Sequence, residues 1–133
     1  MQLVRPPDPY DPGQDAEAAI ARAQARARKA GKLLMIDMGG NWCVDCLVLT
    51  AVMSLPAAKA FIDRHFEVVT VDVGQFDKNL QVPARYRVTL KAVPCVVVVD
   101  AKGKIVNRGQ ELALGSAASL SPQAVLDQLA AWA

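Results

Sequence analysis

Apolar residues recur at helical spacing between residues 16 and 30, where Ile20 and Ala23 fall on one face. Asp15 can cap this segment, and Gly31 suits the position after a last helical turn. The sequence therefore predicts a helix over residues 16–30. Apolar residues predict a further helix over residues 43–55, which Pro56 should break at its end. Helices are also predicted over residues 57–65, 80–86 and 122–132, each with a proline at or near its start.

Continuous apolar runs separate these helices. The run at 32–38 is too short and too uniformly apolar for an amphipathic helix, and the runs at 66–73 and 93–100 are rich in valine. All three predict strands, and a turn at 101–103 predicts that residues 104–108 pair back as an antiparallel edge strand. Since strands that alternate with helices pair in parallel, we expect an α/β fold whose four-stranded mixed sheet has helices on both faces.

The chain of 133 residues, 53% of them hydrophobic, is long enough for one domain with a core and too short for two. Residues 1–13 contain four prolines, so we expect an extended arm ahead of a domain at 14–133. A net charge of +2 is not typical of a nucleic-acid-binding protein. We expect a monomer without a nucleic-acid partner.

The first residues lack the charged and apolar regions of an export signal, and no later run approaches a membrane span. The sequence as it stands therefore predicts a cytoplasmic protein that makes no contact with a membrane. A periplasmic location is expected instead if a signal peptide was removed ahead of residue 2.

Two cysteines, Cys43 and Cys46, follow the first predicted strand and a glycine turn. This order places Cys43 at the start of a helix, where unpaired N–H groups and the helix dipole stabilise a thiolate. Cys46 lies one turn further on the same face, within disulfide reach. The pair is therefore expected to switch between dithiol and disulfide.

Three other interpretations of the cysteine pair remain. Half of a four-cysteine zinc site has the same spacing, but the remaining soft ligands are Cys95 and His65, so we expect neither a metal nor another cofactor. A structural disulfide is less favoured because so short a loop constrains the unfolded chain little. The third is a redox-regulated binding module without turnover.

Several separate motifs resemble those of thioredoxin-fold proteins. They are Trp42-Cys43-x-x-Cys46, the carboxylate of Asp37 six residues before the first cysteine, and the Val93-Pro94 step that enters the third predicted strand. The resemblance covers about 120 residues, with the N-terminal helix in place of a first strand. More narrowly, residues 40–46 (Gly-Asn-Trp-Cys-x-Asp-Cys) and 73–79 resemble a bacterial group of small thioredoxin-like proteins.

The resemblance implies catalytic roles. It makes Cys43 the attacking cysteine, Cys46 the resolving cysteine and Pro94 a cis-proline beside them. Asp37 matches a buried carboxylate that handles the proton of the resolving thiol. Burial under the helix would raise the pKa of Asp37, so that it could act as a base near neutrality.

The substrate-binding residues follow from the same resemblance. Trp42 is expected to shield the disulfide and to shape the contact surface. Val93 and its backbone would hold the substrate as an added strand segment. Cys95, directly after the expected cis-proline, is either a buried thiol that fills core space or an accessory thiol.

Two departures from the thioredoxin pattern stand near the cysteines. Thr70 occupies the position where thioredoxins often carry a lysine, and Val44-Asp45 replaces the usual Gly-Pro between the cysteines. The sequence still predicts a thiol-disulfide oxidoreductase that reduces or exchanges protein disulfides. Its expected partners are disulfide-containing protein substrates and an upstream dithiol protein that supplies electrons.

Overall fold

The computed structural model describes residues 8–133, so residues 1–7 of the predicted arm at 1–13 lie outside the described part of the chain. The elements follow in the order α1 (Ala16–Ala30), β1 (Leu33–Gly39), α2 (Val44–Met53), α3 (Pro56–His65), β2 (Phe66–Asp72), α4 (Gln81–Arg85), β3 (Cys95–Val99), the short 3₁₀ helix η1 (Ala117–Ser119) and α5 (Pro122–Trp132).

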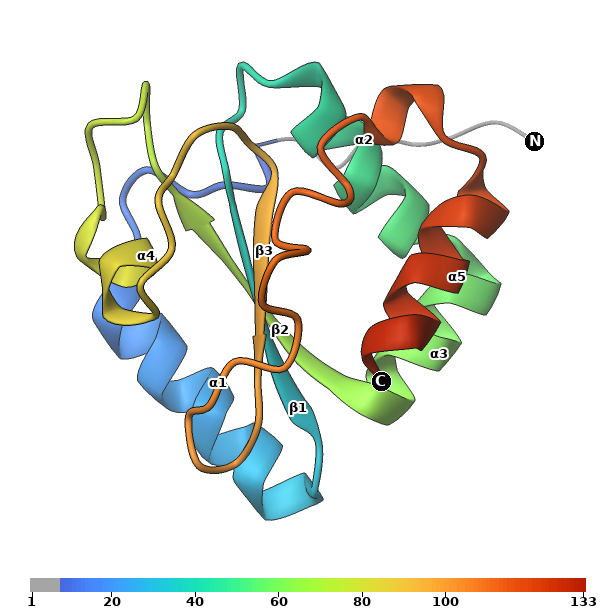
Figure 1. The fold of residues 1–133 in the computed structure, drawn as a ribbon, viewed down its shortest axis with the longest axis horizontal. Coiled ribbons are helices and arrows are strands. Elements are labelled where there is room, and N and C mark those ends of the chain that lie inside the picture. The colour runs from blue at the N-terminus through green and yellow to red at the C-terminus, as the bar shows by residue number, and fades with distance from the viewer. Residues whose placement is uncertain (1–7) are drawn as a thin grey trace.

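A three-stranded sheet in the order β2-β1-β3 forms the centre of the fold (Figure 1). The central strand β1 pairs in parallel with β2 and antiparallel with β3. Helices α1 and α4 lie on one side of this sheet, and α2, α3 and α5 lie on the other. The predicted α/β class, with a mixed sheet between helices, is confirmed.

Successive residues of β1 point to opposite faces of the sheet, and both faces are buried. Leu34 and Ile36 belong to the apolar cluster that includes residues of α1, whereas Met35 belongs to the cluster that includes α2, α3 and α5. This burial on both faces explains why the run reads as continuously apolar.

The ends of α1 agree with the sequence prediction. A carboxylate oxygen of Asp15 accepts a hydrogen bond from the Ala18 N–H at 3.1 Å, and Gly31 takes a left-handed conformation with φ of 69°. Pro56 separates α2 from α3, as expected.

Among residues 8–133 no single helix is long and apolar enough to cross a membrane; α2 and α3 reach that length and composition only together, across an 83° bend.

The predicted fourth strand at 104–108 is wrong, because this segment makes one isolated bridge, between Ile105 and Val99. The buried side chain of Asn107 takes the place of the missing ladder. Its Oδ1 accepts from the Val98 N–H at 3.0 Å, and its Nδ2 donates to the Val96 carbonyl at 2.8 Å. A side-chain amide therefore satisfies two groups on the outer edge of β3, beside separate backbone bonds such as that from the Val106 N–H to the Val98 carbonyl at 2.8 Å.

Candidate functional site

The two cysteines lie where β1 passes into α2. Cys43 is the N-cap residue of α2, and its Sγ accepts a hydrogen bond from the Cys46 N–H at 3.1 Å. Cys43 keeps 7% of its surface exposed, whereas Cys46 has none. Both are free thiols. The pair thus consists of an outer and an inner thiol, one helical turn apart.

Burial is the main reason why the pKa of Cys46 is raised well above its ordinary value, and its hydrogen bond with Cys43 acts in the same direction. The negative charges of Cys43 and Asp37 add smaller contributions. Cys46 therefore stays a thiol near neutral pH unless a nearby base accepts its proton.

The residues before β3 approach the outer thiol. The Val93-Pro94 peptide bond is cis, and both residues are buried. The Cys43 Sγ lies 3.7 Å from the Val93 carbonyl oxygen, at the limit of a weak hydrogen bond to sulfur. Two chain segments fifty residues apart in sequence thus meet at the Cys43 thiol.

Asp37 lies inside the sheet, in register with Thr70 on β2 and Val96 on β3. It is fully buried, and burial raises its pKa to about 7. One oxygen, Oδ1, accepts a hydrogen bond from the Tyr10 hydroxyl at 2.8 Å, which opposes that rise. The other, Oδ2, has no hydrogen-bond partner among the described residues. Asp37 can therefore exchange a proton near neutral pH.

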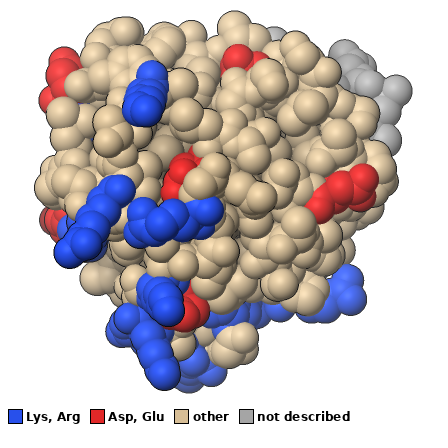
Figure 2. All heavy atoms as spheres, in the orientation of Figure 1, with Lys and Arg blue, Asp and Glu red and all other residues tan. Residues whose placement is uncertain are grey.

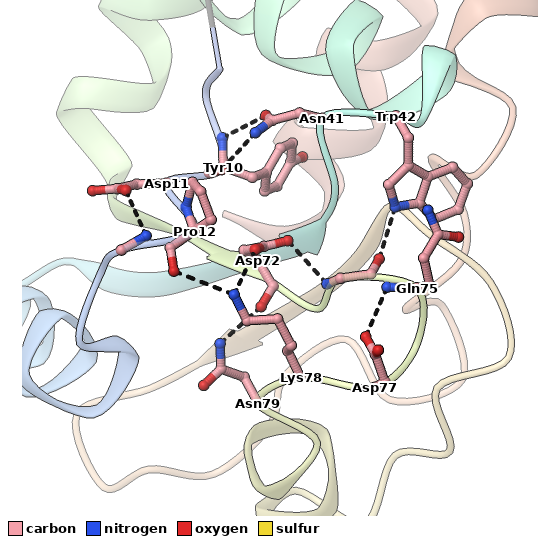
Figure 3. Close-up of polar contacts among 12 residues, drawn as sticks. Tyr10, Asp11, Pro12, Asn41, Trp42, Asp72, Gln75, Asp77, Lys78 and Asn79 are labelled. Atoms are coloured by element: carbon pink, nitrogen blue, oxygen red, sulfur yellow. Dashed lines mark hydrogen bonds and ion pairs between the residues drawn. The ribbon is translucent and has the colours of Figure 1, made fainter.

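Tyr10 is the buried residue that the sequence prediction missed. Its side chain is fully buried in the apolar cluster that also contains Cys46. Asn41, two residues before Cys43, accepts from the Tyr10 N–H at 3.0 Å and donates to the Tyr10 carbonyl at 2.7 Å (Figure 3). The available signal was a lone aromatic residue within the proline-rich arm.

Trp42 lies on the surface beside Cys43, with 48% of its area exposed. Its indole N–H donates to the Gly74 carbonyl at 2.7 Å, and its ring contacts that of Phe76 at a centroid distance of 6.0 Å. Figure 3 shows the Trp42 side chain reaching from the start of α2 to the loop that follows β2. This loop, residues 73–79, is the second sequence motif singled out above.

That loop is held by its own polar side chains. Asp72 accepts from the Gly74 N–H at 2.9 Å and from the Lys78 ammonium at 3.2 Å. Asn79 donates to the Asp72 carbonyl at 2.8 Å (Figure 3). These contacts hold the loop that carries Phe76 and accepts the hydrogen bond from Trp42.

The carboxylate of Asp45 accepts a hydrogen bond from the Ala118 N–H at 2.9 Å, which ties α2 to η1.

Cys95 begins β3 opposite Met38 and is fully buried. Burial, followed by the negative charges of Glu111 and Asp37, raises the pKa of Cys95 to about 12. Whether Cys95 acts as an accessory thiol remains a prediction.

No group of three or more His, Cys, Asp or Glu side chains among residues 8–133 is arranged to hold a metal ion. A cavity of about 280 Å³ borders Asp37. Its lining includes Pro9, Thr50, Lys59 and Thr70.

Residues 15–101 match the model of a family described as thioredoxin-like. The chain belongs to this thioredoxin-like family. No curated protein sequence matches it.

Three solved structures resemble most of the chain. The disulphide isomerase from Xylella fastidiosa Temecula1 is 35% identical with a TM-score of 0.87, over 92% of this chain and 94% of that one. Trxlp from Edwardsiella tarda EIB202 is 26% identical with a TM-score of 0.52, over 89% and 95%. A DsbH oxidoreductase, 23% identical with a TM-score of 0.54 over 88% and 93%, shares the fold. The fold and the similar solved structures together support a thiol-disulfide oxidoreductase in general.

Proposed function

We propose that the protein reduces or exchanges disulfides of other proteins through a reversible Cys43–Cys46 disulfide. The observation that carries the proposal is the position of Cys43: an N-cap thiol that accepts the Cys46 N–H and faces the Val93 carbonyl. The 35% identity to a disulphide isomerase over nearly the whole chain supports the same class of reaction.

Attack comes first. The Cys43 thiolate forms a bond to one sulfur of the substrate disulfide, and the other substrate sulfur leaves as a thiolate. Cys43 is suited to this role because it is the outer thiol and because the N–H groups at the start of α2 stabilise negative charge on it. Cys46, fully buried behind it, is not accessible to a protein substrate.

Resolution follows. The Cys46 S–H proton passes to Asp37, and the Cys46 thiolate attacks the Cys43 sulfur, which releases the second substrate sulfur. Two electrons have then moved from the dithiol to the substrate, and a Cys43–Cys46 disulfide remains. We propose a dithiol protein as the partner that returns these electrons.

The surface beside Cys43 suits a polypeptide substrate. Trp42, the residue before Cys43, and Phe76, whose ring contacts that of Trp42, both expose apolar rings. We propose that these rings contact the substrate chain and that Val93, before Pro94, binds its backbone.

The test is a turnover assay with insulin as substrate and a recycling dithiol reductant, together with two trapping variants. We expect Cys46→Ser to accumulate mixed disulfides that resist further exchange, because resolution is blocked, and Cys43→Ser to accumulate none. Equal trapping by both variants would refute the assignment of roles. Reversible oxidation of the pair without turnover would instead favour a redox-regulated binding module.

A further inference from the structure

Tyr10 contacts Asp37, the proposed acceptor of the Cys46 proton, although Tyr10 belongs to the segment before α1. Its hydroxyl donates to Asp37 at 2.8 Å. A methyl group built on Gly39 would lie 2.9 Å from the Tyr10 oxygen and 2.7 Å from the Cys46 Sγ, so the hydroxyl and the thiol both lie close to the same point beside the end of β1. Tyr10 is therefore near Cys46 as well as hydrogen-bonded to Asp37.

Side chains from three other segments fix the backbone around Tyr10. Asn41 makes two hydrogen bonds to the Tyr10 backbone, as described above. Thr70 donates to the Pro9 carbonyl at 2.9 Å, and Lys78 donates to the Pro12 carbonyl at 3.2 Å. Figure 3 shows Tyr10, Asn41, Pro12 and Lys78 in this arrangement. The hydroxyl is therefore held in place by contacts on both sides of it along the chain.

We propose that Tyr10 is a positioning residue for the proton transfer from Cys46, because its hydroxyl favours the carboxylate form of Asp37 and leaves Oδ2 to receive the proton. The inference rests on the function proposed above and adds a residue from the N-terminal segment to it. In this step the Cys46 S–H bond breaks and an O–H bond forms on Asp37, with no change of oxidation state.

Tyr10 keeps its own proton throughout. Burial, and then the negative charge of Asp37, raise the pKa of Tyr10 far above its ordinary value. The hydroxyl therefore stays a donor at every pH at which the thiol exchanges. A donor to an ionised carboxylate stabilises the charged form more than the neutral form.

Other charged or titratable groups also surround Asp37. Only Tyr10 among the described side chains donates a hydrogen bond to it. The groups that lie near it or share its cavity are Cys46 from α2, Cys95 from β3, and Lys59 and Asp63 from α3. Cys43, the N-cap residue of α2, lies near Tyr10. Loss of the Tyr10 hydroxyl therefore removes the one hydrogen bond that opposes the effect of burial.

The test compares the wild type with Tyr10→Phe, which keeps the ring and removes the hydroxyl. Each reduced protein is mixed with Ellman's disulfide, and the two released thionitrobenzoate ions are followed from pH 5 to pH 9. The first ion reports attack by Cys43, and the second reports resolution by Cys46. We expect the midpoint of the resolution profile to rise by about one pH unit in Tyr10→Phe, so that resolution slows about fivefold at pH 7. Attack should be unchanged.

Two controls separate positioning from a merely structural role. Tyr86→Phe makes the same change at the end of α4 and should leave both phases unchanged. In an Asp37→Asn background, Tyr10→Phe should have no further effect on resolution, because no carboxylate is left whose ionisation the hydroxyl could affect. A slowing of equal size in both backgrounds, or an unshifted midpoint, would overturn the inference. A wild type that releases no second ion would refute the proposed function itself.

Discussion

Gly39 is the residue at which the buried thiol, the tyrosine ring and the central strand meet. A methyl group on its Cα would lie 2.7 Å from the Cys46 Sγ and 2.8 Å from the Tyr10 Cζ. Atoms do not pack at such distances, so any side chain at this position would push one of them away. The last residue of β1 must therefore be glycine for thiol and ring to approach Asp37 together.

We expect Gly39→Ala to lower the free energy of unfolding by about 2 kcal/mol through overpacking. Urea unfolding of the reduced protein measures the change. Gly13→Ala is a matched control, because a methyl group there would meet its nearest atom at 3.5 Å, an ordinary contact. Equal stability of Gly39→Ala and the wild type would mean that Cys46 and Tyr10 have space to move.

Local signals explain which residues of the site were predictable. A strand, a glycine turn and a helix start are all visible within residues 33–46, so the positions of Cys43 and Cys46 follow from neighbours in the sequence. The burial of Tyr10 does not, because its partner Asp37 is 27 residues away. Nothing in the proline-rich segment indicates that its one aromatic residue returns to the core.

The helices were predictable for the same reason as the cysteines. Asp15 and Gly31 mark the ends of α1 through contacts within the helix, and Ser121 caps α5 by accepting from the Ala124 N–H at 3.0 Å. The edge strand was not predictable, because the decision between backbone pairing and a side-chain amide lies with Asn107. Ile105 and Val106, which precede it, are equally compatible with a strand and with the observed loop.

Replacement of Asn107 by alanine should therefore be costly. Asn107→Ala leaves the Val98 N–H and the Val96 carbonyl buried without partners, and we expect the free energy of unfolding to fall by about 3 kcal/mol. Thermal or urea unfolding measures the loss, with Gln123→Ala on the exposed side of α5 as a control. A loss below about 0.5 kcal/mol would show that backbone or water replaces the amide.

Charge is unevenly distributed over the molecule. In Figure 2 Lys and Arg gather along the left and lower edge, over α4 and the turn after β3, and the region over α2 is largely uncharged. Arg85, Arg87, Lys104 and Arg108 line one cavity on the basic side. On this face of the molecule, the surface over α2, the helix that Cys43 caps, is thus mainly neutral.

The stability of the whole molecule should depend on pH through Asp37. Its pKa is about 7 in the folded protein against an ordinary value of 3.8, so the folded state binds more protons between these values. The free energy of unfolding therefore falls as pH rises from about 4 to 7, by about 4 kcal/mol in total. Urea unfolding of the reduced protein between pH 4 and pH 8 measures this slope.

Asp37→Asn should remove most of that slope and make the protein more stable than the wild type at pH 8, by about 3 kcal/mol. Asp127→Asn, which changes an exposed carboxylate on α5, is the control and should keep the slope. A wild-type curve that is flat between pH 4 and pH 7 would mean that Asp37 is ionised throughout.

The outer side of β3 is already occupied by the protein's own chain. Val96 donates to the Glu111 carbonyl, Val98 donates to Asn107, and Asp100 donates to the Lys104 carbonyl. A polypeptide that docks on Val93 as an added strand therefore runs out of free backbone partners once it passes Pro94. Under the proposed function, recognition would be confined to the few residues around the target cysteine, and the protein would accept unrelated sequences as long as their disulfide can reach the Cys43 thiol.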